Sequence, residues 1–115
     1  MPDPAYLVIA RIHGVAVRPA ELTEAAHALA GACRDQAECL SFDVLAEPDS
    51  RSELVLLSAW QSEAAMRAHY GSEAYARFSS AVTDLLTRPS DVRIHRVAGT
   101  VHPIADLSTE PQRAS

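Results

Sequence analysis

The chain has 115 residues, enough for one domain and too few for two. Apolar residues make up 48% and charged residues 22%, which are the proportions of a globular protein. The net charge of −5, without an arginine cluster on any predicted element, argues against nucleic-acid binding. No run approaches the ~20 apolar residues of a membrane span, and Met1–Pro4 lack the features of a signal peptide. We therefore expect a cytoplasmic protein with neither nucleic-acid nor membrane partners.

Cofactor and metal motifs are missing from the sequence. Cys33 and Cys39 form no CxxC pair and no zinc-like spacing, so reduced thiols are favoured over a disulfide. The five histidines are scattered without ligand spacing. There is also no P-loop, GxGxxG, GxSxG or HExxH motif. We expect no metal site and no cofactor.

The first part of the chain predicts a strand and a helix. Residues 5–17 are rich in β-branched and aliphatic side chains, and both faces are apolar at the start, as in a strand covered on two sides. Residues 19–37 follow as an amphipathic helix that begins at Pro19. The apolar positions at helical spacing are Leu22, Ala25, Ala26, Leu29 and Cys33.

A hairpin comes next. Residues 39–47 alternate between apolar and polar, which predicts a strand with one wetter face. The segment Pro48-Asp49-Ser50-Arg51 has turn-favouring residues and leads to a second strand over 52–61. The residues expected on the apolar face of the first of these strands are Leu40, Phe42 and Val44.

Two helices and a strand complete the pattern. Ser62 is a plausible N-cap for a short helix to about His69, and Gly71 ends that helix. Ser72 caps a third helix, which Pro89 stops. Its apolar stripe is formed by Tyr75, Phe78, Val82, Leu85 and Leu86.

The final segments fix the expected architecture. Residues 91–101 predict a last strand, and 102–115 form a C-terminal tail, either an arm over a partner or disordered. The domain at 5–101 then reads β-α-β-β-α-β, an α+β ferredoxin-like fold with an antiparallel sheet. Helices would cover one face of the sheet and leave aliphatic residues bare on the other. A homodimer that packs two sheets together is the simplest explanation.

Several residues between the second strand and the third helix keep the order and spacing of one known family. They are Leu40, Phe42, Pro48-Asp49, Trp60, Ala65, His69, Tyr75 and Phe78. On these residues the chain resembles the antibiotic biosynthesis monooxygenase (ABM) family over about residues 6–100. The resemblance implies a dimeric α/β barrel.

The chain departs from two branches of that family. It has Ser79 where the heme-degrading branch has its axial histidine, so heme breakdown is disfavoured. It shares Trp60 with the polyketide anthrone oxygenases, but Leu56 and Met66 stand where those enzymes have an Asn and a substrate-contacting Tyr. The chain is therefore not a simple copy of either branch.

The resemblance implies a monooxygenase that uses neither metal nor flavin. A small aromatic or quinol-type substrate would be deprotonated, and its anion would pass an electron to O₂. We expect His69 to be the base or proton relay, because histidine titrates near neutral pH. Trp60 would stack on the substrate, and His13 or Ser58 would orient it if they face the cavity between sheet and helices. The expected substrate-binding residues are Trp60, His13, Ser58, Phe78 and Met66.

Other interpretations remain open. His69 could be structural, Trp60 could be a core residue, and His13 and Ser58 could face a dimer interface. An isomerase or another proton-shuttling enzyme could use the same cavity and the same histidine. A non-catalytic ligand-binding dimer is a third possibility, which a pocket sealed by apolar side chains would support.

Overall fold

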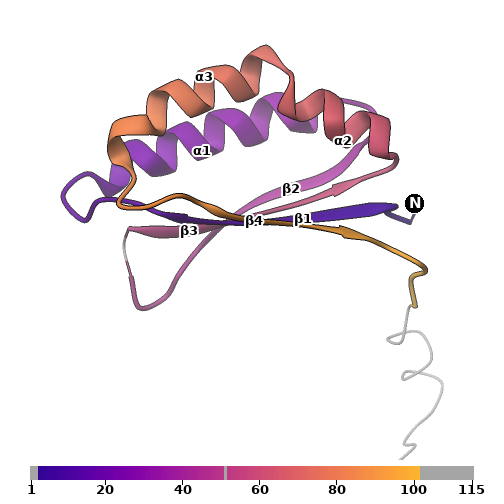
Figure 1. Cartoon of the computed structure of the whole chain (residues 1–115), viewed down its shortest axis with the longest axis horizontal. Coiled ribbons are helices and arrows are strands. Elements are labelled where there is room, and N and C mark those ends of the chain that lie inside the picture. Colours follow the sequence, from indigo (N-terminus) through magenta and orange to yellow (C-terminus); the bar gives the residue numbers. More distant parts are fainter. Residues whose placement is uncertain (1–2, 51, 102–115) are drawn as a thin grey trace, which may run out of the picture.

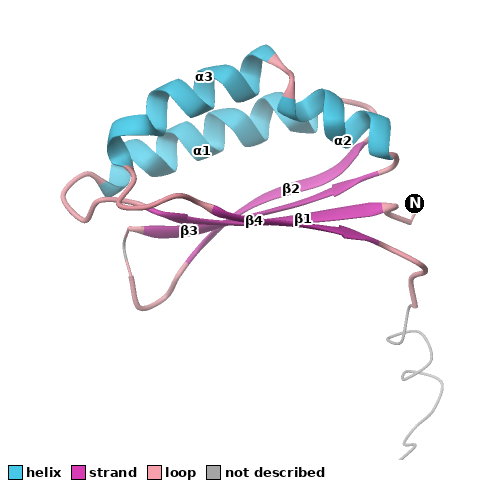
Figure 2. Cartoon of the chain, viewed as in Figure 1, coloured by secondary structure: helices cyan, strands magenta, loops and turns pink. Residues whose placement is uncertain are grey.

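A four-stranded antiparallel sheet carries three helices on one of its faces (Figure 1). This computed structural model describes residues 3–50 and 52–101. The elements in chain order are β1 Tyr6–His13, α1 Pro19–Arg34, β2 Cys39–Ala46, β3 Glu53–Trp60, α2 Glu63–Tyr70, α3 Glu73–Val82, the 3-10 turn η1 Thr83–Leu85 and β4 Asp91–Arg96. The expected ferredoxin-like α+β fold is confirmed, with its second helical region divided into α2 and α3 (Figure 2).

Strand pairing decides which side chains share a face. The strand order is β2-β3-β1-β4. Val8 of β1 lies opposite Ser58 of β3, and Phe42 of β2 lies opposite the same Ser58. Because side chains alternate along a strand, all residues at this parity point to the helices, and their neighbours point to the other face.

The core lies between the sheet and the helices. Apolar stripes of α1 and α3 pack over β1, β2 and β3, and α1 contacts both β2 and α3. Trp60 at the end of β3 and Cys33 in the last turn of α1 are both fully buried there. The other large core residues include Val8, Ile12, Leu22, Leu29, Phe42, Leu54, Leu56, Phe78, Val82 and Leu85.

The first and last strands are shorter than the sequence predicted, because each loses its neighbour. β1 stops at His13, which lies opposite the first residue of β3. β4 stops at Arg96, opposite the first residue of β1, and one further hydrogen bond joins the Val97 N–H to the Ala5 carbonyl at 2.8 Å. The predicted tail, 102–115, lies outside the described residues.

One expected alternation is also interrupted. Pairing of β2 with β3 passes directly from Cys39 opposite Trp60 to Ser41 opposite Ala59. Leu40 is the extra residue of this β-bulge. The sequence predicts that Leu40 shares the face of Phe42, and the bulge makes this prediction wrong.

The sheet face away from the helices carries partly exposed aliphatic residues. Leu7 and Ile9 of β1 and Leu57 of β3 have intermediate exposure, and Leu45 at the β2 edge is 46% exposed. Within residues 3–50 and 52–101, all three helices lie on the opposite side (Figure 1). No helix in this part of the chain is both long and apolar enough to cross a membrane.

Gly14 occupies a crowded junction after β1. Its N–H donates to the Ser52 carbonyl at 2.7 Å, and it forms an isolated bridge with Leu86. A Cβ atom here would lie 2.6 Å from Leu22 Cδ2 and 2.8 Å from the Ser52 oxygen. Any other residue at position 14 would therefore require the backbone to move.

We predict that Gly14→Ala lowers the free energy of unfolding by about 2 kcal/mol, the usual scale of overpacking. Gly31→Ala is the matched control, because a Cβ on this exposed α1 residue meets nothing within 4 Å. Gly31→Ala should raise stability by about 0.5–1 kcal/mol, since alanine favours the helix. Urea unfolding followed by circular dichroism measures both; equal effects of the two substitutions would contradict the assignment.

Candidate functional site

The short helix α2 delivers one histidine into the core. Ser62 caps the helix by accepting a hydrogen bond from the Ala65 N–H at 3.1 Å, as the sequence predicted. At the other end the Gly71 N–H donates to the Arg67 and Ala68 carbonyls, both at 3.2 Å. His69 lies in the last turn and points inward, with only 3% of its surface exposed.

Aromatic rings enclose His69. Its imidazole stacks on Trp60, with ring centroids 5.0 Å apart and an interplanar angle of 29°. Tyr70, Tyr75 and Phe42 meet it edge-on, at centroid distances of 4.6, 5.3 and 5.8 Å. These contacts fix the plane of the ring.

Polar partners of this cluster are few. His69 Nδ1 lies 3.3 Å from Cys33 Sγ on α1. Trp60 Nε1 donates to Ser58 Oγ at 3.0 Å, so the buried indole is satisfied. Among the described residues, His69 Nε2 forms no hydrogen bond. A buried ring nitrogen without a partner is unusual and is the main sign of a functional site here.

Burial controls the protonation of the cluster. Desolvation lowers the pKa of His69 from its ordinary 6.5 to about 4. Burial raises the pKa of the Cys33 thiol to about 12 and that of Tyr70 also to about 12. The imidazole, thiol and phenol are therefore all neutral at pH 7.

His69 lines a small cavity between the sheet and the helices. Its volume is about 40 Å³, room for a few water molecules but not for an aromatic ring system. Hydroxyls and the imidazole supply its polar groups, and most of the wall is apolar. The lining residues are Val8, Ala10, Ile12, Leu29, Phe42, Leu56, Ser58, His69, Tyr70, Tyr75, Phe78, Ser90 and Val92.

The β4 side of the cavity is lightly covered. Val8 lies opposite Ile94 and Ala10 opposite Val92, so both β4 residues point to the helix side. They are nevertheless 48% and 42% exposed, because in the described structure the helices pack over the other three strands. Ser90 and Val92 line the cavity at this edge.

The structure brings together some of the predicted site residues and separates others. Ser58, Phe78 and His69 line the cavity. Trp60 does not; it lies behind His69 with no exposed surface, so its ring face is used by the imidazole rather than by a ligand. Met66 is a core residue, 6% exposed, and lies outside the cavity wall.

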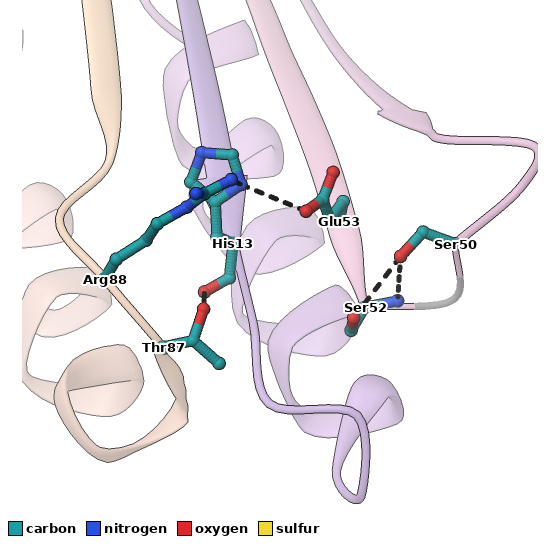
Figure 3. Close-up of polar contacts among 6 residues, drawn as sticks. All are labelled: His13, Ser50, Ser52, Glu53, Thr87 and Arg88. Carbon is teal, nitrogen blue, oxygen red and sulfur yellow. Dashed lines mark hydrogen bonds and ion pairs between the residues drawn. The ribbon is translucent and has the colours of Figure 1, made fainter.

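His13 does not reach the cavity, which corrects that expectation. Its neighbour Ile12 faces the helices, so alternation turns His13 to the opposite side of the sheet. Its Nδ1 lies 3.2 Å from Glu53 Oε2 and 3.2 Å from Arg88 Nη2. Figure 3 shows the three side chains together at this end of the sheet. Its carbonyl accepts from Thr87 Oγ1 at 3.2 Å, tying β1 to the segment before β4 (Figure 3).

Three residues next to His69 were not predicted as part of the site. The sequence predicts only a reduced thiol at Cys33 and a place in an apolar helix stripe for Tyr75. Cys33 is 36 positions from His69 in sequence, so no local spacing signals their contact. Tyr70 directly follows His69 in the sequence, and Tyr75 lies five residues further on. These two nearby tyrosines could have indicated an aromatic surrounding for His69.

A second, larger hollow has different chemistry. An open groove of about 700 Å³ runs between α1 and α3 and is walled mainly by alanines. Its rim carries the exposed ion pair of Glu73 and Arg77, 3.6 Å apart. Within residues 3–50 and 52–101, no three His, Cys, Asp or Glu side chains are grouped to hold a metal ion. The His69 cavity is the better candidate site.

Comparison with known proteins identifies the family. The sequence profile of the antibiotic biosynthesis monooxygenase family matches residues 5–81, which is more than half of the chain. The chain therefore belongs to this family, as its resemblance had indicated. None of the curated proteins compared with the chain matches it.

Solved structures agree with this assignment. The chain is 29% identical to Rv0793 from Mycobacterium tuberculosis, with a TM-score of 0.78, covering 84% of this chain and 98% of that one. PA3566 from Pseudomonas aeruginosa shows 22% identity and a TM-score of 0.76, with 84% and 97% covered. A candidate antibiotic biosynthesis monooxygenase from Nitrosomonas europaea shows 19% identity and 0.77, with 82% and 99% covered. The last two establish the fold alone.

Burial of neutral His69 makes stability depend on pH. The unfolded chain protonates this histidine near pH 6.5, whereas the folded chain resists protonation down to about pH 4. The stabilisation that comes from keeping this imidazole neutral is therefore fully present above pH 6.5. It is lost as pH falls towards 4, which lowers the free energy of unfolding by up to about 3 kcal/mol.

We predict that His69→Phe removes this pH-dependent part of the free energy of unfolding. Urea unfolding at pH 7.5, 5.5 and 4.5 measures it; parallel pH profiles for the two proteins would contradict the assignment.

Proposed function

We propose that this protein is a cofactor-independent monooxygenase that acts on a small aromatic or quinol-type substrate. Family membership supports a monooxygenase-like role. The observation that carries the proposal is His69, a neutral and buried imidazole whose Nε2 has no described partner at a small, mostly apolar cavity. We also infer a cytoplasmic location, because Cys33 and Cys39 are both free thiols.

The reaction needs a base and a dry pocket. His69 Nε2 removes a proton from an acidic O–H or C–H of the substrate, and the resulting anion passes one electron to O₂. The substrate radical and superoxide combine through a new C–O bond, and the imidazolium returns its proton to give a hydroperoxide. A carbon that began as CH₂ then loses water to become C=O, so that one oxygen atom enters the product and the other leaves as water.

The low basicity of His69 limits which substrates can react. Proton transfer from a phenol with pKa near 10 to an imidazole with pKa about 4 is uphill by about 8 kcal/mol. The anion and imidazolium attract each other by about 4 kcal/mol at ~4 Å with an effective dielectric of ~20. The net free-energy cost of the proton transfer therefore fits within an activation barrier of ~16 kcal/mol, which corresponds to ~10 turnovers per second. More acidic substrates should therefore react faster.

Substrate entry requires the cavity to open. The present volume of about 40 Å³ is far below the ~300 Å³ or more of ordinary ligand pockets. Tyr70 and Tyr75 are partly exposed and line the cavity, and Val92 is exposed on the β4 side. Outward rotation of these tyrosines would admit a flat ring over β4 and bring it next to His69.

The small, mostly apolar cavity also supports a second candidate function, which is ligand binding without catalysis. An isomerase would use His69 in the same way but would not consume oxygen. The three functions differ in their dependence on O₂. Only the oxygenase consumes O₂, and only the isomerase converts its substrate under strict anaerobiosis. The binding module converts no substrate with or without O₂.

We predict that His69→Ala lowers O₂ uptake with a panel of quinols and anthrones by at least about 100-fold, because the general base is lost. His27→Ala is the matched control, since His27 is an exposed residue of α1. In the unaltered protein, rates should rise with substrate acidity.

Unchanged turnover in His69→Ala would remove this residue from the mechanism. Product formation without oxygen would replace the oxygenase with the isomerase. Binding without turnover, measured by calorimetry, would establish the module. Circular dichroism of each variant checks that the fold is retained.

We further propose that the bare sheet face packs against that of a second copy. The face carries Leu7, Ile9 and Leu57 in its middle, and an apolar surface of this kind is normally covered. Charged residues of both signs lie towards its margins, and Arg93 and Asp91 of β4 already form an ion pair with each other at 3.4 Å.

Leu57→Glu should convert this dimer to a monomer at ~10 µM, because a charge would be buried at its centre. Val17→Glu is the control, since Val17 lies outside the sheet and is 84% exposed. Light scattering coupled to size-exclusion chromatography gives the mass. A monomeric unaltered protein would refute the dimer.

A further inference from the structure

The thiol of Cys33 has no evident reactivity of its own. It is fully buried in the last turn of α1, and burial raises its pKa to about 12. A thiol of this kind stays protonated and is a poor nucleophile. Its notable contact is with His69 Nδ1, at 3.3 Å, a distance at which sulfur and nitrogen share a hydrogen.

This contact can exist in two forms. Either the thiol donates to Nδ1 and the imidazole carries its proton on Nε2, or Nδ1–H donates to sulfur and Nε2 keeps a free lone pair. The two forms present opposite chemistry to the cavity, a donor in the first and an acceptor in the second. Only the second lets His69 act as a base.

The surroundings of the ring favour the second form. Within the described residues no oxygen or nitrogen accepts a hydrogen bond from Nε2. The protein groups around the imidazole are mainly aromatic rings, with Tyr70 and Tyr75 meeting it edge-on, and such rings are weak acceptors. Leaving a buried N–H unsatisfied costs about 1–3 kcal/mol, and buried N–H groups without partners are rarer than unpaired acceptors.

The structure assigns Cys33 as the positioning residue of the site: its sulfur accepts Nδ1–H of His69 and so holds the Nε2 lone pair ready for the substrate. This assignment rests on the proposed function for its catalytic meaning, but not for the tautomer itself. Trp60 fixes the plane of the ring by stacking on it, and Cys33 fixes its rotation and its proton.

Nitrogen-15 NMR of the histidine rings in the full chain reads the tautomer directly. We expect His69 to carry its proton on Nδ1 at pH 7. Cys33→Ser keeps an acceptor and should preserve the tautomer and kcat within about twofold. Cys33→Val fills a similar volume without an acceptor; it should shift the proton towards Nε2 and lower kcat by at least about tenfold with little change in KM, as when the outer partner of a functional histidine is removed.

The two proposals fail separately. A proton on Nε2 in the unaltered protein, or an unchanged tautomer in Cys33→Val, would overturn the role of Cys33 even if His69→Ala abolishes turnover. If no substrate is turned over but the tautomer follows these substitutions, the positioning role stands and the oxygenase falls. Should Cys33→Val not fold, the spectrum of the unaltered protein and of Cys33→Ser still decide.

Discussion

Pairing of β1 with β3 determines what the cavity contains. Val8 lies opposite Ser58, and this register points Ser58 and Trp60 towards the helices while it points His13 away from them. A shift by one residue would invert both faces, because side chains alternate with a period of two. The burial of Ile12 and Leu54 on the helix side makes such a shift costly. The chemistry of the site thus depends on a hydrophobic constraint.

Desolvation then gives His69 its character. The ring lies between Trp60 and the edges of two tyrosines, where a charge is poorly solvated and the pKa falls to about 4. The histidine stays neutral at pH 7, at the expense of basicity. This balance suits a substrate that is itself acidic, and it explains why a single thiol contact matters: in an apolar surrounding, few groups can decide where the proton lies.

The helix layer covers the sheet unevenly. The helices lie over one face of the sheet (Figure 1), whereas Val92 and Ile94 on the helix side of β4 are 42% and 48% exposed. The closed part supplies the stability and the dry surroundings of His69. In the function that we propose, the open part gives access to the substrate, and Tyr70 and Tyr75 rotate outward to admit it.

Much of this architecture could be predicted from periodicity alone. Alternation in the strands, helical spacing from Leu22 to Cys33 and the caps Ser62 and Ser72 specified the element order, since these signals act within a few residues of each other. The resemblance to the family also singled out His69, which the structure places at the cavity with Ser58 and Phe78.

Contacts distant in sequence could not be predicted in this way. Whether His13 or Ser58 faces the cavity depended on the register between β1 and β3, which spacing within one strand does not contain. The stacking of Trp60 on His69 and the pairing of Cys33 with that same ring depend on how α1 and α2 lie over the sheet. The sequence by itself determined the elements and their order, because those follow from local periodicity. Only the tertiary structure decided which polar groups share a dry cavity, because that depends on packing between segments far apart in the chain.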